Sequence, residues 1–179
     1  MTSTGIVRRV DHLGRLVIPK ELRRRLRWRD GAPVEVFTAS DGIVCLKKYT
    51  SMGEDSITAQ KLADSVSQAT KYTVCVSDMD RMIAVAGSTA VKSQLMEKDI
   101  SMELEKAIDA RKPLIAECMP IIITLGKDSG YSHAAIAPII CEGDTEGAVV
   151  IVSNDMKIDE NALMHAKAAA LFLADRLAV

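Results

Sequence analysis

Aromatic residues are scarce in this sequence, and so are the usual signs of export or membrane insertion. The 179 residues include one Trp, two Phe and three Tyr, so a folded core must be built from aliphatic side chains and Met. No apolar run reaches the length of a membrane-spanning helix. The first residues do not show the charged-then-apolar pattern of a secretory signal. These absences predict a cytoplasmic protein.

Patterns that bind metals or drive catalysis are also missing. The four cysteines, at positions 45, 75, 118 and 141, match no CxxC pair and no zinc-binding spacing. The three histidines, at positions 12, 133 and 165, are equally scattered. We find no glycine-rich phosphate loop and no paired carboxylates in a catalytic setting. The sequence therefore predicts no metal, no cofactor and no catalytic residue.

Charge is distributed unevenly along the chain. Residues 1–50 contain eleven Lys and Arg against five acids, a net charge of +6. The rest of the chain contains twelve basic and nineteen acidic residues, a net charge of −7. A basic cluster on a small folded unit is typical of a protein that binds a polyanion, most often nucleic acid. The alternative is an ordinary solvated surface.

The basic N-terminal part, residues 1–50, alternates short β-rich segments with turns. Strands are predicted at 5–10, 16–18, 34–38 and 43–46, and a helix is predicted at 20–28 after Pro19. Four short strands and one helix cannot enclose much core, so we expect a partner chain to complete it.

Several segments of this part resemble the AbrB-like swapped-hairpin DNA-binding domain. They are TGIVRRVD (4–11), LGR (13–15), VIPKELRR (17–24) and LKKY (46–49). The resemblance implies a β-barrel made by two interleaved chains, with double-stranded DNA as partner. It implies DNA contacts by five arginines: Arg8, Arg9, Arg15, Arg23 and Arg24. Arg9 is the weaker candidate of these, and Trp28 is expected to pack in the core or the dimer rather than stack on a base.

Residues 57–179 are predicted to form a separate α+β domain after a linker at 51–56. The helices are predicted at 57–70, 101–111 and 159–178, and the strands at 72–77, 82–86, 121–125, 134–141 and 148–152. The last helix carries an apolar seam at spacings of three and four, formed by Leu163, Ala166, Ala170, Leu173 and Leu177. This seam fits two roles, covering the domain's own sheet or contacting a second copy.

The second domain resembles a GAF domain in three places: APII (137–140), Gly143 and GAVVI (147–151). GAF domains commonly hold a small ligand, so the resemblance implies a possible ligand-sensing role, and no pocket residue is predicted. An AbrB-like domain followed by a GAF-like domain resembles the stage V sporulation protein T family of transcription regulators.

These patterns favour a homo-oligomeric, sequence-preferring DNA-binding transcription regulator of sporulation genes, associated with the nucleoid. The dimer is expected through residues 1–50, and the sequence does not choose between this dimer and a tetramer formed through the helices of the second domain. One alternative is an antitoxin that binds a toxin partner. Another is a GAF-type methionine sulfoxide reductase using Cys75, Cys118 and Cys141, which their apolar neighbours disfavour.

Overall fold

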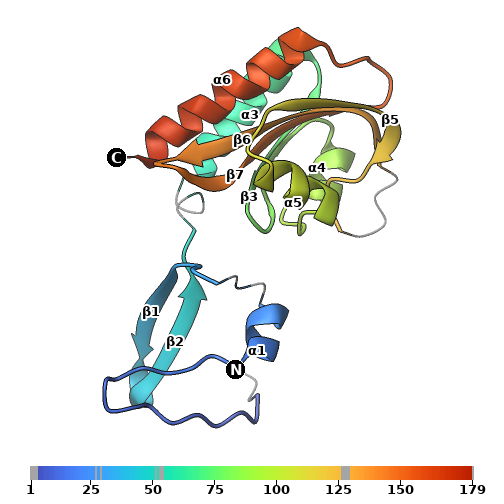
Figure 1. Cartoon of the computed structure of the whole chain (residues 1–179). Helices are drawn as coiled ribbons and strands as arrows, with labels where there is room; N and C mark the ends of the chain where they lie inside the picture. Colours follow the sequence, from blue (N-terminus) through green and yellow to red (C-terminus); the bar gives the residue numbers. More distant parts are fainter. Residues whose placement is uncertain are drawn as a thin grey trace. The chain divides into compact units, whose positions relative to one another are not determined.

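The computed structural model describes residues 4–26, 28, 30–50, 52, 55–125 and 130–178. The chain divides into two compact units, Met1–Tyr49 and Thr50–Val179, here called the head and the body. Figure 1 shows both units, and each is described by itself.

The head contains one short helix and one two-stranded antiparallel sheet. Helix α1 (Lys20–Arg25) begins directly after Pro19, whose missing N–H is no loss at a helix start. Strands β1 (Val34–Ala39) and β2 (Ile43–Lys48) pair with Val36 opposite Leu46. The 3₁₀ turn η1 (Ser40–Gly42) joins them, and Asp41 and Gly42 both have positive φ there, of 68° and 72°.

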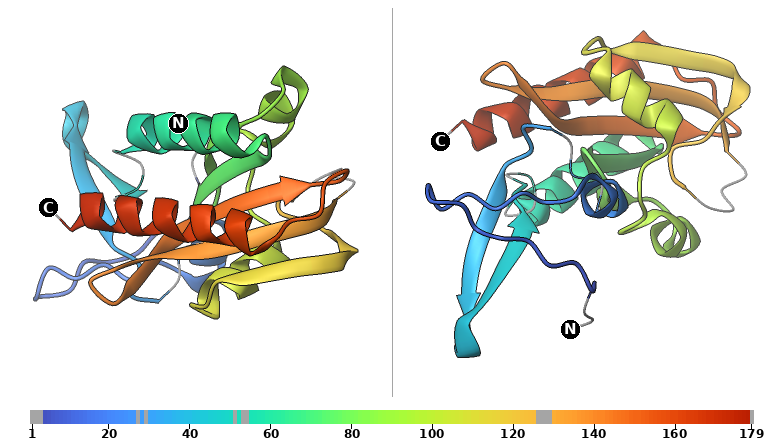
Figure 2. Two further views of the ribbon diagram at one scale, coloured as in Figure 1. Left: turned by 90° about the horizontal axis from the view of Figure 1, so that it is seen from above. Right: turned by 60° about the horizontal axis from the view of Figure 1, so that its bottom comes forward.

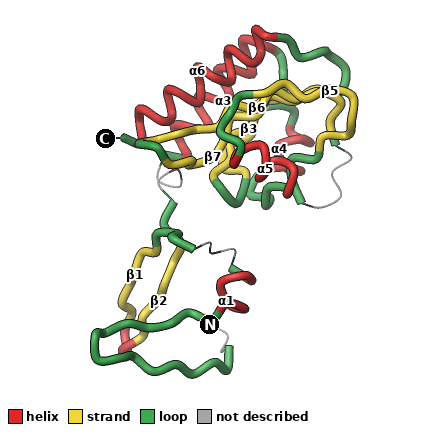
Figure 3. The backbone as a smooth tube through the Cα atoms, viewed as in Figure 1, coloured by secondary structure: helices red, strands yellow, loops and turns green. Residues whose placement is uncertain are grey.

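The predicted strands at 5–10 and 16–18 are wrong for the single chain. Figure 3 shows the segment before α1 as a loop that folds back on itself, without strand assignment. A strand needs a neighbour to share its backbone hydrogen bonds along its length. At the turn between these two arms, Asp11 N donates to Arg15 O at 3.1 Å, and neither arm is assigned as a strand. The helix predicted to reach residue 28 ends at Arg25.

The body is a five-stranded antiparallel sheet with helices on both faces. The strand order is β4-β3-β7-β6-β5. The strands are β3 (Thr73–Asp78), β4 (Met82–Ala86), β5 (Leu114–Ile121), β6 (Tyr131–Cys141) and β7 (Asp144–Ser153). The helices are α3 (Ser56–Thr70), α4 (Thr89–Leu95), α5 (Met102–Asp109) and α6 (Glu160–Leu177).

Two hydrophobic cores lie on the two faces of the sheet. Helices α3 and α6 cover one face, where Val76, Ala137 and Ile151 are buried. Helices α4 and α5 cover the other face through residues such as Leu104 and Ile108. Strands β3, β6 and β7 are buried on both faces, which explains their nearly continuous apolar sequence.

Two local features stabilise the sheet. Gly147 lies where a Cβ would collide with the backbone oxygen of Ser77, so only glycine allows β7 to approach β3 this closely. At the edge strand β4, the Gln60 side chain of α3 accepts from Val85 N at 3.1 Å and donates to Val85 O at 3.0 Å. The amide thereby occupies backbone groups that an edge strand would otherwise expose.

The apolar seam of α6 is part of the body's own core. Its three central members, Ala166, Ala170 and Leu173, are buried against the sheet, and Leu163 and Leu177 are partly buried beside them. Small side chains at two of these positions let the helix lie close to β6 and β7. The first of the two roles predicted for this seam is therefore the one the structure shows.

The sequence patterns missed one helix and misplaced one strand. Helix α4 was not expected, and the strand predicted at 121–125 lies instead at Leu114–Ile121, with only an isolated bridge at Thr124. Pro120 lies inside β5, at an edge of the sheet and at an irregular register, where proline costs fewest hydrogen bonds. None of the helices in the described part of the chain combines the length and apolarity needed to cross a membrane.

Candidate nucleic-acid interface

The turn at residues 11–15 is held together by the carboxylate of Asp11. Its Oδ1 accepts hydrogen bonds from the backbone N–H groups of Leu13 at 2.9 Å and Arg15 at 2.8 Å. Its Oδ2 accepts from Arg15 Nε at 2.7 Å, which makes an ion pair. Gly14 takes a φ of 76°, which glycine adopts without strain. The turn therefore presents Arg15 from a backbone that its own aspartate stabilises.

These hydrogen bonds favour the charged form of Asp11 and lower its pKa. The hydrogen bond from the backbone N–H of Arg15, followed by that from its guanidinium, holds the pKa of Asp11 below its ordinary value of 3.8. The folded state thus favours the charged carboxylate, so its stabilisation is complete above pH 3.8 and is lost as pH falls through the lowered pKa. We expect an NMR titration of the Asp11 carboxyl carbon to give a pKa below 3.8.

The variant Arg15→Ala separates the two causes. Since it keeps the backbone N–H that has the larger influence, the pKa of Asp11 should move toward 3.8 without reaching it. A wild-type pKa at or above 3.8 would contradict the structure of this turn.

Helix α1 carries the second group of arginines. Arg24 is exposed, whereas Arg23 is half-buried and forms an ion pair through its Nη1 with Asp30 Oδ1. On the other side of the helix, Leu22 and Leu26 face a groove of the head. The helix is thus amphipathic, with basic residues filling its last turn.

The five predicted contact residues lie on three short segments. Arg8 and Arg9 are exposed on the arm before the turn, and Arg8 Nη1 donates to the carbonyl of Val7 at 3.1 Å. Arg15 follows the turn, and Arg23 and Arg24 lie on α1. Arg27 and Arg29, which were not assigned to contacts, lie outside the described residues.

Sequence reasoning missed the two aspartates that pair with these arginines. Asp11 could have been found, because an Asp followed within four residues by Gly and Arg is typical of a turn closed by its own side chain. Asp30 carries no comparable signal, since its pairing with Arg23 depends on how the chain turns after α1.

An apolar groove of about 400 Å³ lies between the N-terminal arms, α1 and β2. Its walls include Ile6, Leu16, Leu22, Trp28 and Leu46. Trp28 is thus on the apolar side of the head, which agrees with the packing role expected from the sequence.

The described residues of the head form no buried core of their own. No described residue between positions 4 and 50 is buried. Many of its large apolar side chains are exposed: Ile6, Val7, Val10, Leu13, Leu16, Val17, Leu26, Val36, Phe37, Ile43, Val44 and Leu46. Val7 is 84% exposed and Val17 71% exposed, which is unusual for residues of this type within a folded unit. Such a surface is typical of a unit that folds against a partner.

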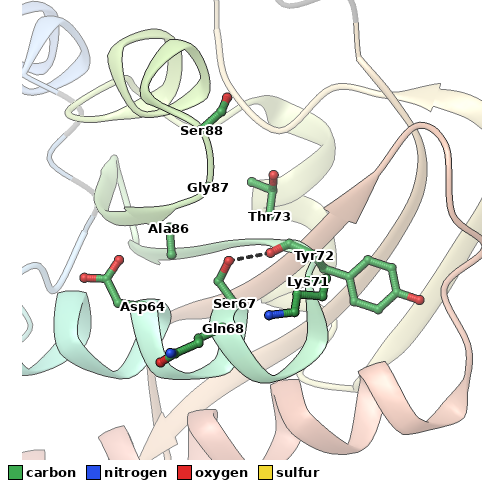
Figure 4. A pocket seen from close by; sticks show the side chains of 9 residues that line it. All are labelled: Asp64, Ser67, Gln68, Lys71, Tyr72, Thr73, Ala86, Gly87 and Ser88. Atoms are coloured by element: carbon green, nitrogen blue, oxygen red, sulfur yellow. Dashed lines mark hydrogen bonds between the residues drawn. The ribbon is translucent and has the colours of Figure 1, made fainter.

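The body contains a polar pocket of about 430 Å³ at the C-terminal end of α3 (Figure 4). Asp64, Ser67 and Gln68 from α3 lie opposite Gly87 and Ser88, which follow β4. Ser67 Oγ donates to the carbonyl of Tyr72 at 2.7 Å, as drawn in Figure 4. The pocket is open to solvent and lined mainly by polar groups.

The cysteines of the body that the structure describes are not gathered at one place. Cys75 is buried on the α4–α5 face. It lies opposite Val150 of β7, which in turn lies opposite Ile136 of β6. Cys141 lies five residues further along β6, where partial burial, followed by the charge of Glu142, raises its pKa above 9.0. A raised pKa leaves less of the reactive thiolate. The side chain of Cys118 lies outside the described residues.

Two family models match the chain. The first, described as the C-terminal domain of stage V sporulation protein T, transcription factor, matches residues 55–178. The second, described as the bacterial antitoxin MazE, involved in antidote–toxin recognition, matches residues 7–53.

Curated relatives extend the similarity over the whole chain. Stage V sporulation protein T of Bacillus subtilis (strain 168) is 40% identical over 178 residues, which cover 99% of either chain. The transition state regulatory protein AbrB of the same organism is 42% identical over 69 residues, 38% of this chain and 71% of AbrB.

Solved structures resemble the body in fold. The GAF-B domain of DevS from Mycobacterium smegmatis is 18% identical with a TM-score of 0.53, covering 69% of this chain and 93% of that domain. A type II free methionine-R-sulfoxide reductase from Thermoplasma acidophilum is 12% identical with a TM-score of 0.55, covering 70% and 94%. At these identities the likeness confirms the GAF-like α+β fold and nothing about activity. With the AbrB-like head before it and a relative matched from end to end, the chain belongs to the stage V sporulation protein T family of transcription factors.

Proposed function

We propose that this protein is a homo-oligomeric, sequence-preferring DNA-binding regulator of sporulation genes that acts at the nucleoid in the cytoplasm. Residues 1–50 bind double-stranded DNA, residues 51–56 are the linker, and residues 57–179 form the regulatory and oligomerisation domain. No catalytic residue is assigned to it.

The exposed arginines of the head carry this proposal. Arg8, Arg9, Arg15 and Arg24 are exposed around the turn and α1, on a head whose net charge is +6. Guanidinium groups suit phosphate and guanine because their planar fork donates two parallel hydrogen bonds. Phosphate contacts would supply most of the affinity, and arginine spacing together with DNA deformability would supply the sequence preference.

The missing core of the head supports dimerisation through residues 1–50. A second copy would fill the groove lined by Leu22 and Leu46 and cover exposed residues such as Val7. It would also supply strand neighbours for the arms at 5–10 and 16–18, as in a swapped-hairpin barrel. Each dimer would then present every arginine twice.

An exposed apolar stripe on α6 supports a tetramer. Met164, Leu171 and Phe172 are 64%, 70% and 48% exposed, and Ala168 lies between them on the same side of the helix. This stripe is distinct from the buried seam of the same helix. Two head-linked dimers could join through it, which would give a dimer of dimers.

The GAF-like fold of the body supports a small-molecule effector. The pocket beside Asp64 and Gly87 has the volume to hold a small polar molecule. We propose ligand sensing, rather than catalysis, as its role, since the thiols described in the body are separated along the sheet and Cys141 has a raised pKa.

Fluorescence anisotropy of the full chain with an AT-rich duplex, across a salt series, tests the proposal. We expect tight binding, and a log affinity that falls linearly with log salt by about 0.9 for each phosphate contacted. A well-folded oligomer that binds no duplex would contradict the proposal and would favour a protein partner, as in antitoxins.

A further inference from the structure

Among its described residues, the head has two aspartate–arginine pairs that engage different nitrogens of the guanidinium. In the first, Asp11 contacts Arg15 at Nε, 2.7 Å away. In the second, Asp30 contacts Arg23 at the terminal Nη1. The position matters because an arginine reads guanine or a phosphate in its bidentate end-on mode with its two Nη groups.

The Asp11 pair leaves the outer edge of Arg15 available. Within the described residues neither Nη nitrogen of Arg15 has a recorded partner, and its side chain is 70% exposed. Asp11 is itself fixed, because its other oxygen accepts two backbone N–H groups of the turn. The carboxylate thus holds the guanidinium by its inner nitrogen and directs its outer edge to solvent.

The Asp30 pair has the opposite geometry. The Asp30 side chain is 93% exposed and occupies one of the nitrogens that Arg23 would offer to DNA. An exposed carboxylate of this kind contributes little stability. It competes with a phosphate for the same donor.

We propose that Asp11 is a positioning residue that pre-orients Arg15 for DNA, whereas Asp30 masks Arg23 until DNA displaces it. This inference rests on the proposed DNA-binding function. It predicts opposite effects for two substitutions that each remove one negative charge from the same head.

Asp11→Asn tests the positioning role without removing the turn. The amide oxygen can still accept the N–H groups of Leu13 and Arg15, whereas the amide nitrogen is a donor and repels Arg15 Nε. Simple charge counting predicts tighter DNA binding, because the head becomes more positive. We expect binding about tenfold weaker instead. Without Asp11 to orient it, the Arg15 side chain must be ordered when DNA binds, and this happens in both copies of a dimer.

Asp30→Asn and Asp41→Asn are the matched comparisons. Asp30→Asn should tighten binding about two- to threefold by releasing Arg23. Asp41→Asn removes the same charge from the β1–β2 turn, where asparagine tolerates the positive φ of 68°. It should change the affinity by less than about twofold, through screened charge alone.

The variants are measured by anisotropy in the full-length protein, with each Asp variant also combined with Arg15→Ala. If Asp11 acts through Arg15, Asp11→Asn should cause no further loss of affinity in the Arg15→Ala protein. If Asp11→Asn instead collapses the turn, it should weaken DNA binding both in the wild type and in the Arg15→Ala protein. Binding by Asp11→Asn as tight as by Asp41→Asn would overturn the inference. Absence of binding by the wild type would instead refute the proposed function.

Discussion

Replacing Arg24 or Arg15 by alanine is expected to lower the affinity for an AT-rich duplex by about 100-fold without unfolding the protein. One arginine contact with DNA contributes about 1–3 kcal/mol, and each is present twice in a dimer. Both side chains are largely exposed, so their loss leaves no cavity. Anisotropy at fixed salt measures the affinity, and thermal melting checks that the fold is unchanged.

Arg25→Ala is the control, because it removes the same charge from the same helix at a position not assigned to DNA contact. Its effect should be well below that of Arg24→Ala. If a variant loses a phosphate contact, its salt slope should fall by about one, whereas loss of a base contact should relax sequence preference. Unchanged affinity in both Arg15→Ala and Arg24→Ala would refute the assignment of the surface.

Leu46→Asp is expected to abolish head dimerisation and DNA binding together. Leu46 lies in β2 opposite Val36 and lines the apolar groove of the head. A second copy seated there would bury the new carboxylate without a partner, which costs several kcal/mol. Analytical ultracentrifugation should show a loss of one association step, and the same sample should not bind the duplex.

Leu46→Met controls for changes in side-chain shape, because this exchange nearly conserves volume and usually costs less than about 1.5 kcal/mol. It should keep both the mass and the affinity of the wild type. A Leu46→Asp variant with unchanged mass and unchanged DNA binding would show that the groove is not an interface between copies. Circular dichroism of the variant verifies that the chain remains folded, since the body is a compact unit separate from the head.

Much of the body could be predicted because its periodic signals are strong. The strands β6 and β7 and the last helix were expected within a few residues of their observed ends. Helix α4 was missed because it is only seven residues long and has one buried residue, Leu95, so it lacks an apolar repeat. Strand β5 was misplaced because Pro120 argues locally against a strand, and pairing with β6 overrides that preference.

The head shows a different limit of prediction from sequence. Its β-rich segments at 5–10 and 16–18 were predicted as strands, yet in the single chain neither is assigned as a strand. Local propensity describes what a backbone prefers, whereas a strand exists only where a neighbour provides the hydrogen bonds. The same lack of a neighbour explains why none of the described residues of the head is buried.

By itself, the sequence determined the contrast between a basic head and an acidic body, the family of the chain and the identity of the candidate arginines. These are properties of residue type and order, which do not depend on distant contacts. Only the tertiary structure decided that the α6 seam faces its own sheet and that α6 also exposes Met164 and Leu171. It alone paired Arg15 with Asp11 through Nε and Arg23 with Asp30 through Nη1, because the atom that meets a carboxylate depends on backbone geometry.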